Sequence, residues 1–196
     1  MFILLSKNLG HRLGASGTKL ENTLQAIEGT IQYVNKSDFK YWEFDVQETA
    51  DGVLIVFHDD CISYDTSEIC IKEIQYEEMV DYSKKLGIRI PKFSEVYNIL
   101  KVRNEPVMIE IKNIFSERAR EEIFSSLVNR ENWKLMATPT RFLESFPEDI
   151  RPRWRQYANQ NDIHFVRVGR HNIDLFKSEQ SRFGWMFAKP KWLFGF

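Results

Sequence analysis

The stretch YWEFDVQETADGVLIVFHDD, residues 41–60, contains two largely apolar segments separated by a turn. The Asp51-Gly52 pair between YWEFDVQ and VLIVFHD is a strong hairpin signal, so the two segments are predicted to be neighbouring strands. The first segment carries Glu43 and Asp45, and the second ends at His58. Titratable side chains at these positions indicate that the strands do more than fill a core.

Side chains alternate between the two faces of a strand. In YWEFDVQ, an apolar face therefore opposes a face that holds Glu43 and Asp45. In PVMIEIK (106–112), the same alternation places Glu110 and Lys112 together on the polar face. If helices cover the apolar faces, the polar faces line the interior of a barrel or a crevice at the carboxyl ends of the strands, where α/β proteins build active sites.

Strands and helices alternate along the chain. The expected strands are residues 2–11, 41–47, 53–59 and 106–112, and the expected helices are residues 20–34, 93–102 and 116–130, the last with Ser116 as its N-cap. Beyond residue 133, the segments 133–139, 153–158, 163–170 and 184–189 each read as a strand. This order predicts an α/β fold with a mainly parallel sheet, in one domain over residues 1–196.

The composition is that of an ordinary globular chain, with 43% hydrophobic and 28% charged residues. No apolar run is long enough for a transmembrane segment and no leader is apparent, so we expect a cytoplasmic protein with Cys61 and Cys70 as free thiols. Residues 130–196 hold 12 Lys and Arg against 7 Asp and Glu. No nucleic-acid motif accompanies the basic run RPRWRQYANQ (151–160), so we expect no nucleic-acid partner.

The acidic residues predict a metal site. Residues i and i+2 of a strand lie about 6.5 Å apart, so Glu43 and Asp45 can reach one cation, and Glu110 on a neighbouring strand supplies a third carboxylate. An all-oxygen ligand set favours one divalent cation, Mg²⁺ or Ca²⁺, over zinc. The alternative is that Glu43 and Asp45 form the exposed face of an edge strand.

Two histidines stand beside this cluster in the predicted order. His11 stands at the end of the first expected strand and precedes Arg12, and His58 stands at the end of the third. Phosphodiester cleavage needs one group to deprotonate the attacking oxygen, one to protonate the leaving oxygen, and cations to stabilise the phosphoryl charge. His11, His58, Arg12 and Lys112 match those needs, although a single histidine at a strand end is more often structural.

Taken in order, five segments resemble the glycerophosphodiester phosphodiesterase family: GHR (10–12), LENT (20–23), EFDVQETADGVLIVFHDD (43–60), IPKFSEV (90–96) and IEIKN (109–113). The resemblance implies a (β/α)₈ TIM-type barrel with its site at the strand ends. It implies that Glu43, Asp45 and Glu110 bind one divalent cation, Mg²⁺ or Ca²⁺, and that His11 and His58 are the acid–base pair. The resemblance also implies that three residues bind the substrate phosphate: Arg12, Lys112 and Asn22.

The implied reaction is metal-assisted cleavage of a phosphodiester to an alcohol and a phosphomonoester, in lipid or glycerol metabolism. The alternatives are a lyase that releases a cyclic phosphate and a catalytically silent binding protein. The family usually has glycine at the position of Leu13 and proline at that of Leu20. Few residues are available for the cap that the family inserts before IPKFSEV, so we expect a minimal cap and an open mouth. Such a mouth would admit a bulky diester, such as a polymer, a lipid headgroup or a glycan-linked phosphate, and would make simple glycerophosphocholine a poor substrate. The expected partner is thus a phosphodiester substrate, whether a small molecule, a lipid headgroup or a glycan-linked phosphate.

The C-terminal part carries none of the family's later motifs, so we expect the barrel to be shortened or irregular there. We assign His164 and His171 structural or surface roles. The aromatic residues of the tail, Trp185, Trp192, Phe194 and Phe196, are expected to pack on the barrel or on a partner subunit of a homo-oligomer.

Overall fold

The computed structural model describes residues 8–64 and 67–178. Its centre is a six-stranded sheet in the order β2-β1-β5-β6-β7-β8. The strands are β1 (Trp42–Glu48), β2 (Leu54–Val56), β5 (Val107–Asn113), β6 (Trp133–Ala137), β7 (Phe165–Arg167) and β8 (Arg170–Asp174). The four inner strands run parallel, whereas β2 and β8 pair antiparallel at the two edges. The predicted mainly parallel sheet is therefore confirmed.

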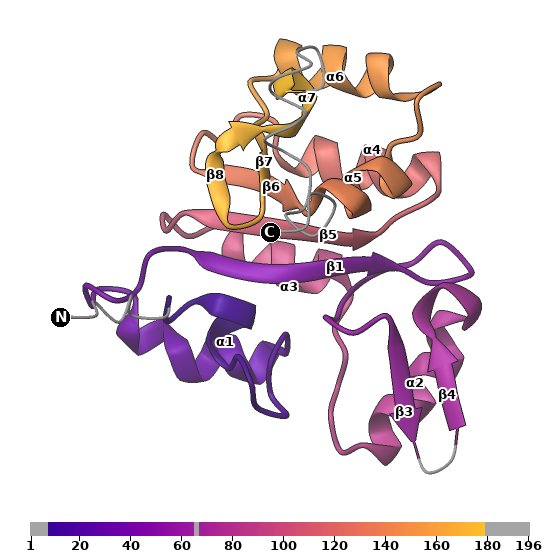
Figure 1. The fold of residues 1–196 in the computed structure, drawn as a ribbon. Helices are drawn as coiled ribbons and strands as arrows, with labels where there is room; N and C mark the ends of the chain where they lie inside the picture. Colours follow the sequence, from indigo (N-terminus) through magenta and orange to yellow (C-terminus); the bar gives the residue numbers. More distant parts are fainter. Residues whose placement is uncertain (1–7, 65–66, 179–196) are drawn as a thin grey trace, which may run out of the picture.

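Helices connect the strands and cover the sheet (Figure 1). They are α1 (Leu24–Thr30), α2 (Tyr76–Lys85), α3 (Phe93–Leu100), α4 (Glu117–Ser126), α5 (Pro139–Ser145), α6 (Arg151–Gln160) and α7 (Leu175–Ser178), with 3₁₀ turns η1 (His11–Gly14), η2 (Ile31–Tyr33) and η3 (Ile71–Glu73). In this view, α1 lies below β1, and α4, α5 and α6 lie above β5. None of the helices described is long and apolar enough to cross a bilayer.

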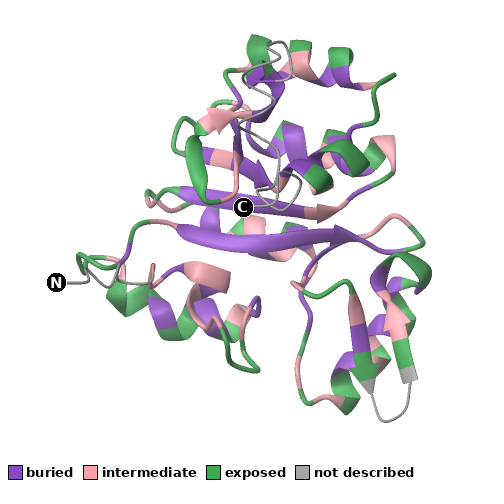
Figure 2. Cartoon of the chain, in the orientation of Figure 1, coloured by how far each residue is buried: buried purple, intermediate pink, exposed green. Residues whose placement is uncertain are grey.

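The main core lies between the apolar faces of the strands and the helices. Trp42 and Phe44 of β1 are fully buried there, as their alternation predicts. A cluster of rings joins the later helices to β7: Phe124, Phe142, Phe146, Phe165 and Phe176. Burying one such side chain stabilises a fold by about 1.5–3 kcal/mol. Burial extends over both faces of β1 (Figure 2), so its polar face is enclosed as well.

The fold class is confirmed as α/β, with an irregular C-terminal half. After β6, only β7 continues the parallel order before β8 turns back antiparallel. Within residues 8–64 and 67–178, the strands form an open sheet rather than a closed ring. The single domain over residues 1–196 stays a prediction, because it includes residues outside the described part.

Several predicted elements match the structure closely. The hairpin around Asp51-Gly52 forms, with β1 and β2 paired antiparallel. The strand 106–112 and the helix 93–102 correspond to β5 and α3. The Ser116 hydroxyl caps α4 by accepting a hydrogen bond from the Ala119 N–H.

Three expectations are corrected. The segment 153–158 is not a strand but part of α6, which has proline in its first turn and buries Trp154 and Ala158 four residues apart on one face. The helix expected from residue 20 begins at Leu24, because the preceding Thr23 forms its N-cap. Of the strand expected over residues 2–11, the described residues 8–11 are not a strand: Leu9 and Gly10 form a turn and His11 begins η1.

Of the other strands expected from residue 133 onward, two are present and one lies outside the described residues. The segments 133–139 and 163–170 contain β6 and β7. The segment 184–189 and the tail aromatic residues, Trp185, Trp192, Phe194 and Phe196, lie outside the described residues.

A small lobe follows β2. It consists of the hairpin β3 (Cys61–Tyr64) and β4 (Ser67–Cys70), then η3 and α2, and it has its own apolar cluster that includes Ile62, Ile71 and Met79. The minimal cap expected in the few residues before IPKFSEV stays a prediction, because no residue of this lobe is among those that line the cavity over the carboxylates. The prediction of free thiols is wrong: Cys61 and Cys70 face each other across the hairpin and form a disulfide. A separation of nine residues does not by itself reveal the register that brings the two cysteines together.

Candidate active site

Three carboxylates converge at the polar face of β1 and β5. Asp45 lies directly opposite Glu110 in the parallel register, and Glu43 precedes Asp45 on the same face. One oxygen from each of the three lies within 4.8 Å of the others. Glu43 and Asp45 are 1% exposed and Glu110 is 7% exposed. The alternative of an exposed edge strand is therefore excluded, since β1 is paired on both sides.

The charges of the cluster are only partly compensated. Burial, and then the Asp45 charge, raise the pKa of Glu43 to about 8, although a hydrogen bond from the Arg12 N–H opposes the shift. Burial would lower the pKa of Lys112, but Asp45 and Glu110 outweigh it and raise that pKa. The Lys112 ammonium lies 3.2 Å from Asp45 Oδ1 and 2.5 Å from Glu110 Oε1.

This donor set fits a hard divalent cation. Glu43 Oε1 is buried and, among the described residues, has no hydrogen-bond partner. A buried carboxylate oxygen without a donor is costly unless it is protonated or binds a cation. Three carboxylates supply the oxygen ligands that Mg²⁺ and Ca²⁺ prefer.

The loop before α1 brings His11 and Arg12 to the cluster. His11 Nε2 lies 3.5 Å from Glu43 Oε2, and its Nδ1 is hydrogen-bonded to Ser16 Oγ at 2.8 Å. Leu13, which stands where the family usually has glycine, has a positive φ of 60°. Its buried side chain anchors the loop in the core, which offsets the strain of this left-handed backbone.

Asn22 and Glu21 hold this loop from the other side. The Asn22 side-chain amide donates to Asp45 Oδ2 at 2.8 Å, and the Asn22 N–H donates to the Arg12 carbonyl at 3.0 Å. Glu21 accepts hydrogen bonds from the Arg12 guanidinium and the Gly17 N–H, both at 2.7 Å. Asn22 therefore contacts a metal-ligand candidate directly. Sequence reasoning missed Glu21, although its place in LENT was a signal.

His58 lies two residues beyond the end of β2, and its Nδ1 is 2.7 Å from Asp59 Oδ1. The side-chain amide of Gln47 donates to the carbonyls of Phe57 and Asp59, at 2.9 and 2.8 Å. Gln47 thus holds the backbone on both sides of His58. Sequence reasoning placed Gln47 on the polar face but assigned it no role.

A cavity of about 450 Å³ opens over the carboxylates. Its lining includes His11, Glu43 and Glu110 together with residues of the β7–β8 turn, among them His171. His58 is not part of this lining. His171, for which we expected a surface or structural role, instead lies in the wall of the cavity. His164 lies beside Asp162, with 3.7 Å between His164 Nε2 and Asp162 Oδ1.

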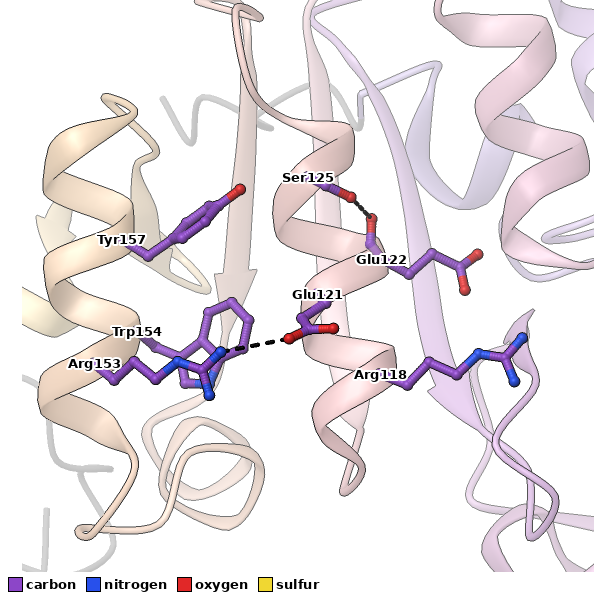
Figure 3. A pocket seen from close by; sticks show the side chains of 7 residues that line it. All are labelled: Arg118, Glu121, Glu122, Ser125, Arg153, Trp154 and Tyr157. Carbon is purple, nitrogen blue, oxygen red and sulfur yellow. Dashed lines mark hydrogen bonds and ion pairs between the residues drawn. The ribbon is translucent and has the colours of Figure 1, made fainter.

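A second cavity, of about 490 Å³, lies between α4 and α6 (Figure 3). Trp154 and Tyr157 come from α6, and an ion pair joins Arg153 to Glu121 of α4. Among the described residues, the lining of this second cavity contains no group of acids or histidines suited to a metal. In the described part of the chain, Glu43, Asp45 and Glu110 form the one such group.

The comparisons with known proteins agree with this geometry. Residues 11–180 match the glycerophosphoryl diester phosphodiesterase family, so the chain belongs to that family. It is 37% identical to lysophospholipase D GDPD3 of Mus musculus over 79 residues, which are 40% of this chain and 22% of that protein. It is 30% identical to the uncharacterized protein YqiK of Bacillus subtilis over 137 residues, which are 65% of this chain and 54% of that protein. The chain thus spans at most about half the length of these relatives.

Solved structures share the fold. A phosphodiesterase of this family from Galdieria sulphuraria has a TM-score of 0.60 at 18% identity, covering 91% of this chain and 71% of its own. One from Silicibacter pomeroyi has a TM-score of 0.56 at 21% identity, covering 81% and 63%. The described part therefore has the α/β fold of the family's TIM barrels, with an open sheet.

Proposed function

We propose that this protein is a metal-dependent phosphodiesterase that cleaves a glycerophosphodiester-like substrate to an alcohol and a phosphomonoester. The observation that carries the proposal is the convergence of Glu43, Asp45 and Glu110 beneath a cavity that also exposes His11. Family membership supports the same reaction class.

The three carboxylates would hold one Mg²⁺ or Ca²⁺, with Glu43 supplying the oxygen that has no protein donor. When bound, the cation would lower the pKa of an attacking hydroxyl and neutralise charge on the phosphoryl group. Asn22 fixes the orientation of Asp45, and the Arg12 N–H fixes that of Glu43. Both carboxylates are thus held in place before any ligand arrives.

In the proposed reaction, one of His11 and His58 accepts the proton of the attacking hydroxyl, and the other donates a proton to the leaving oxygen. The attacking hydroxyl is a neighbouring hydroxyl of the substrate, so the P–O bond to the leaving alcohol breaks as a cyclic phosphate forms. Water then attacks the cyclic phosphate and breaks one of its ring P–O bonds, which gives the phosphomonoester. Arg12 and Lys112 are the side chains whose charge would stabilise the phosphoryl oxygens. Gln47 would keep His58 at the strand end by holding the two flanking carbonyls.

The substrate class follows from the relatives. The family's description names glycerophosphoryl diesters, and the mouse relative is named a lysophospholipase D. We therefore infer that one side of the diester is a glycerol, with or without an acyl chain, and propose a role in lipid or glycerol metabolism.

The test is a phosphodiesterase assay on glycerophosphodiesters and lysophospholipids with Mg²⁺, Ca²⁺ or a chelator. We expect activity that the chelator abolishes and one of the two metals restores. Phosphorus NMR of the product identifies the reaction: a phosphomonoester supports the hydrolase, and an accumulating cyclic phosphate indicates the lyase instead.

Two variants separate the site from the fold. His11→Ala should reduce the rate at least about 100-fold, the range expected for an acid–base group. His164→Ala, a matched change at a half-buried histidine beside Asp162, should leave the rate unchanged. Equal rates for both variants and the wild type would rule out His11 as a catalytic group.

The cellular location is a separate inference. The sequence predicts a cytoplasmic protein, whereas disulfides such as Cys61–Cys70 are typical of oxidising compartments. The cytoplasmic proposal therefore requires that the disulfide seen in the folded chain be opened by cellular reductants. Trapping thiols in freshly lysed cells checks this, and a protected disulfide would argue for another compartment.

A further inference from the structure

One wall of the active-site cavity has no role in the mechanism above. It is the turn between β7 and β8, where Arg167 pairs with Arg170 in the antiparallel register. Gly169 sits at the corner with φ of +72°, a conformation that favours glycine. The turn brings Arg170 and His171 into the lining that also contains Glu43.

The charge around this wall is positive. Arg170 and His171 are exposed. Lys134 lies two residues from Met136 on β6 and therefore on the same face of the strand as Met136, which lines the cavity. Burial first, and then the charge of Lys134, lower the pKa of His171. Burial and the charge of Arg170 likewise lower the pKa of Arg167. No carboxylate of the described residues pairs with Lys134 or Arg170.

The cavity therefore has two regions of opposite charge. Its floor carries Glu43 and Glu110, which would hold the cation, and its wall carries Arg170 with Lys134 nearby. At the floor, the charges of Glu43, Asp45 and Glu110 would balance those of one divalent cation and Lys112, so the diester phosphate would be held there by direct contact with the cation and Lys112 and would not need the wall. Positive charge on the wall is suited to a second anion, because like charges without a counter-ion repel one another.

We propose that Lys134, Arg170 and His171 bind a second phosphate of the substrate, so that the preferred diester carries a phosphomonoester on one of its alcohols. This inference rests on the proposed phosphodiesterase function. The planar fork of Arg170 suits a phosphate, which can accept two of its hydrogen bonds. A cationic headgroup such as choline would meet repulsion at the same wall.

The first arm of the test compares glycerophosphoglycerol with the same diester carrying a phosphate on its far glycerol. We expect kcat/KM to be about tenfold higher for the phosphorylated substrate, equivalent to about 1.4 kcal/mol. In Arg170→Gln, the ratio of the two values should fall towards one. The advantage should also shrink as ionic strength rises, because salt screens exposed charges.

The second arm measures binding and does not depend on turnover. Calorimetry with the Mg²⁺-loaded protein compares glycerol 1,3-bisphosphate with glycerol 3-phosphate. The bisphosphate should bind about tenfold more tightly, and Arg170→Gln or Lys134→Gln should remove most of that difference. If no diester is cleaved, the proposed function fails, and this arm still decides whether the wall binds a second phosphate.

Arg118→Gln is the matched control, because Arg118 is an exposed arginine of α4 in the separate cavity of Figure 3. It removes the same charge and should preserve the wild-type ratios in both arms. Equal binding of the mono- and bisphosphate by the wild type would overturn the proposal. A preference that survives in Arg170→Gln and Lys134→Gln would overturn it too.

Discussion

Glu43→Gln is the sharpest perturbation of the carboxylate cluster, because it removes one charge at nearly constant volume. Glu43 is 1% exposed, and its pKa is raised to about 8 by burial and then by the charge of Asp45. At neutral pH, the metal-free folded protein therefore keeps a proton on Glu43, whereas the unfolded chain does not. Folding and proton binding are coupled at this residue.

The raised pKa of Glu43 makes the stability of the metal-free protein fall as pH rises. A carboxyl whose folded pKa is raised contributes stability that is fully present below its unfolded value, 4.5, and is lost as pH rises through about 8. The difference between these pKa values corresponds to about 5 kcal/mol at most. The measured loss will be smaller, because the proton on Glu43 is coupled to the neighbouring charges of Asp45 and Glu110.

Glutamine has no proton to lose at this position. We expect metal-free Glu43→Gln to be more stable than the wild type at pH 8–9, by about 2–4 kcal/mol on the linkage relation. Added Mg²⁺ or Ca²⁺ should stabilise the wild type, because a ligand that binds only the folded state shifts the equilibrium towards it. The variant should gain little from the same addition.

The assay is urea unfolding between pH 5 and 9, in chelator and in excess metal. Glu28→Gln on α1 is the control, because it makes the same chemical change at an exposed position and should follow the wild type. Two results would refute the reasoning. One is a metal-free variant that loses stability with pH as the wild type does, and the other is full stabilisation of the variant by metal.

Three further predictions concern the surroundings of the site. Gln47→Leu removes both hydrogen bonds beside His58 and should lower kcat about 10- to 100-fold with little change in KM, as steady-state kinetics would measure; an unchanged kcat would contradict this. Ser116→Ala removes the N-cap of α4 and should lower the free energy of unfolding by about 1 kcal/mol, as urea unfolding would measure; an unchanged free energy of unfolding would contradict this. Replacing Cys61 and Cys70 by serine should cost about 2–3 kcal/mol for this short loop, and thiol titration of the unreduced wild type should find neither cysteine free.

Much of the site could be predicted from local sequence alone. The two-residue alternation of a strand assigned Glu43, Asp45 and Glu110 to polar faces, and the structure places them together. The cap of α4 and the turn at Asp51-Gly52 were equally visible, because both depend on residues a few positions apart. Short-range rules worked less well for α6, since a brief amphipathic segment suits either a strand or a helix.

The tertiary structure decided which distant residues meet. Asn22 reaches Asp45 across 23 positions of sequence, and the Arg12 N–H reaches Glu43 across 31, through a loop with left-handed backbone that no local pattern indicates. The β7–β8 turn adds His171 to the same cavity. The sequence by itself determined the kind of site, because side-chain chemistry and strand periodicity are local properties. Strand register and loop packing determined its walls and its charge balance, because both arise only when the whole chain has folded.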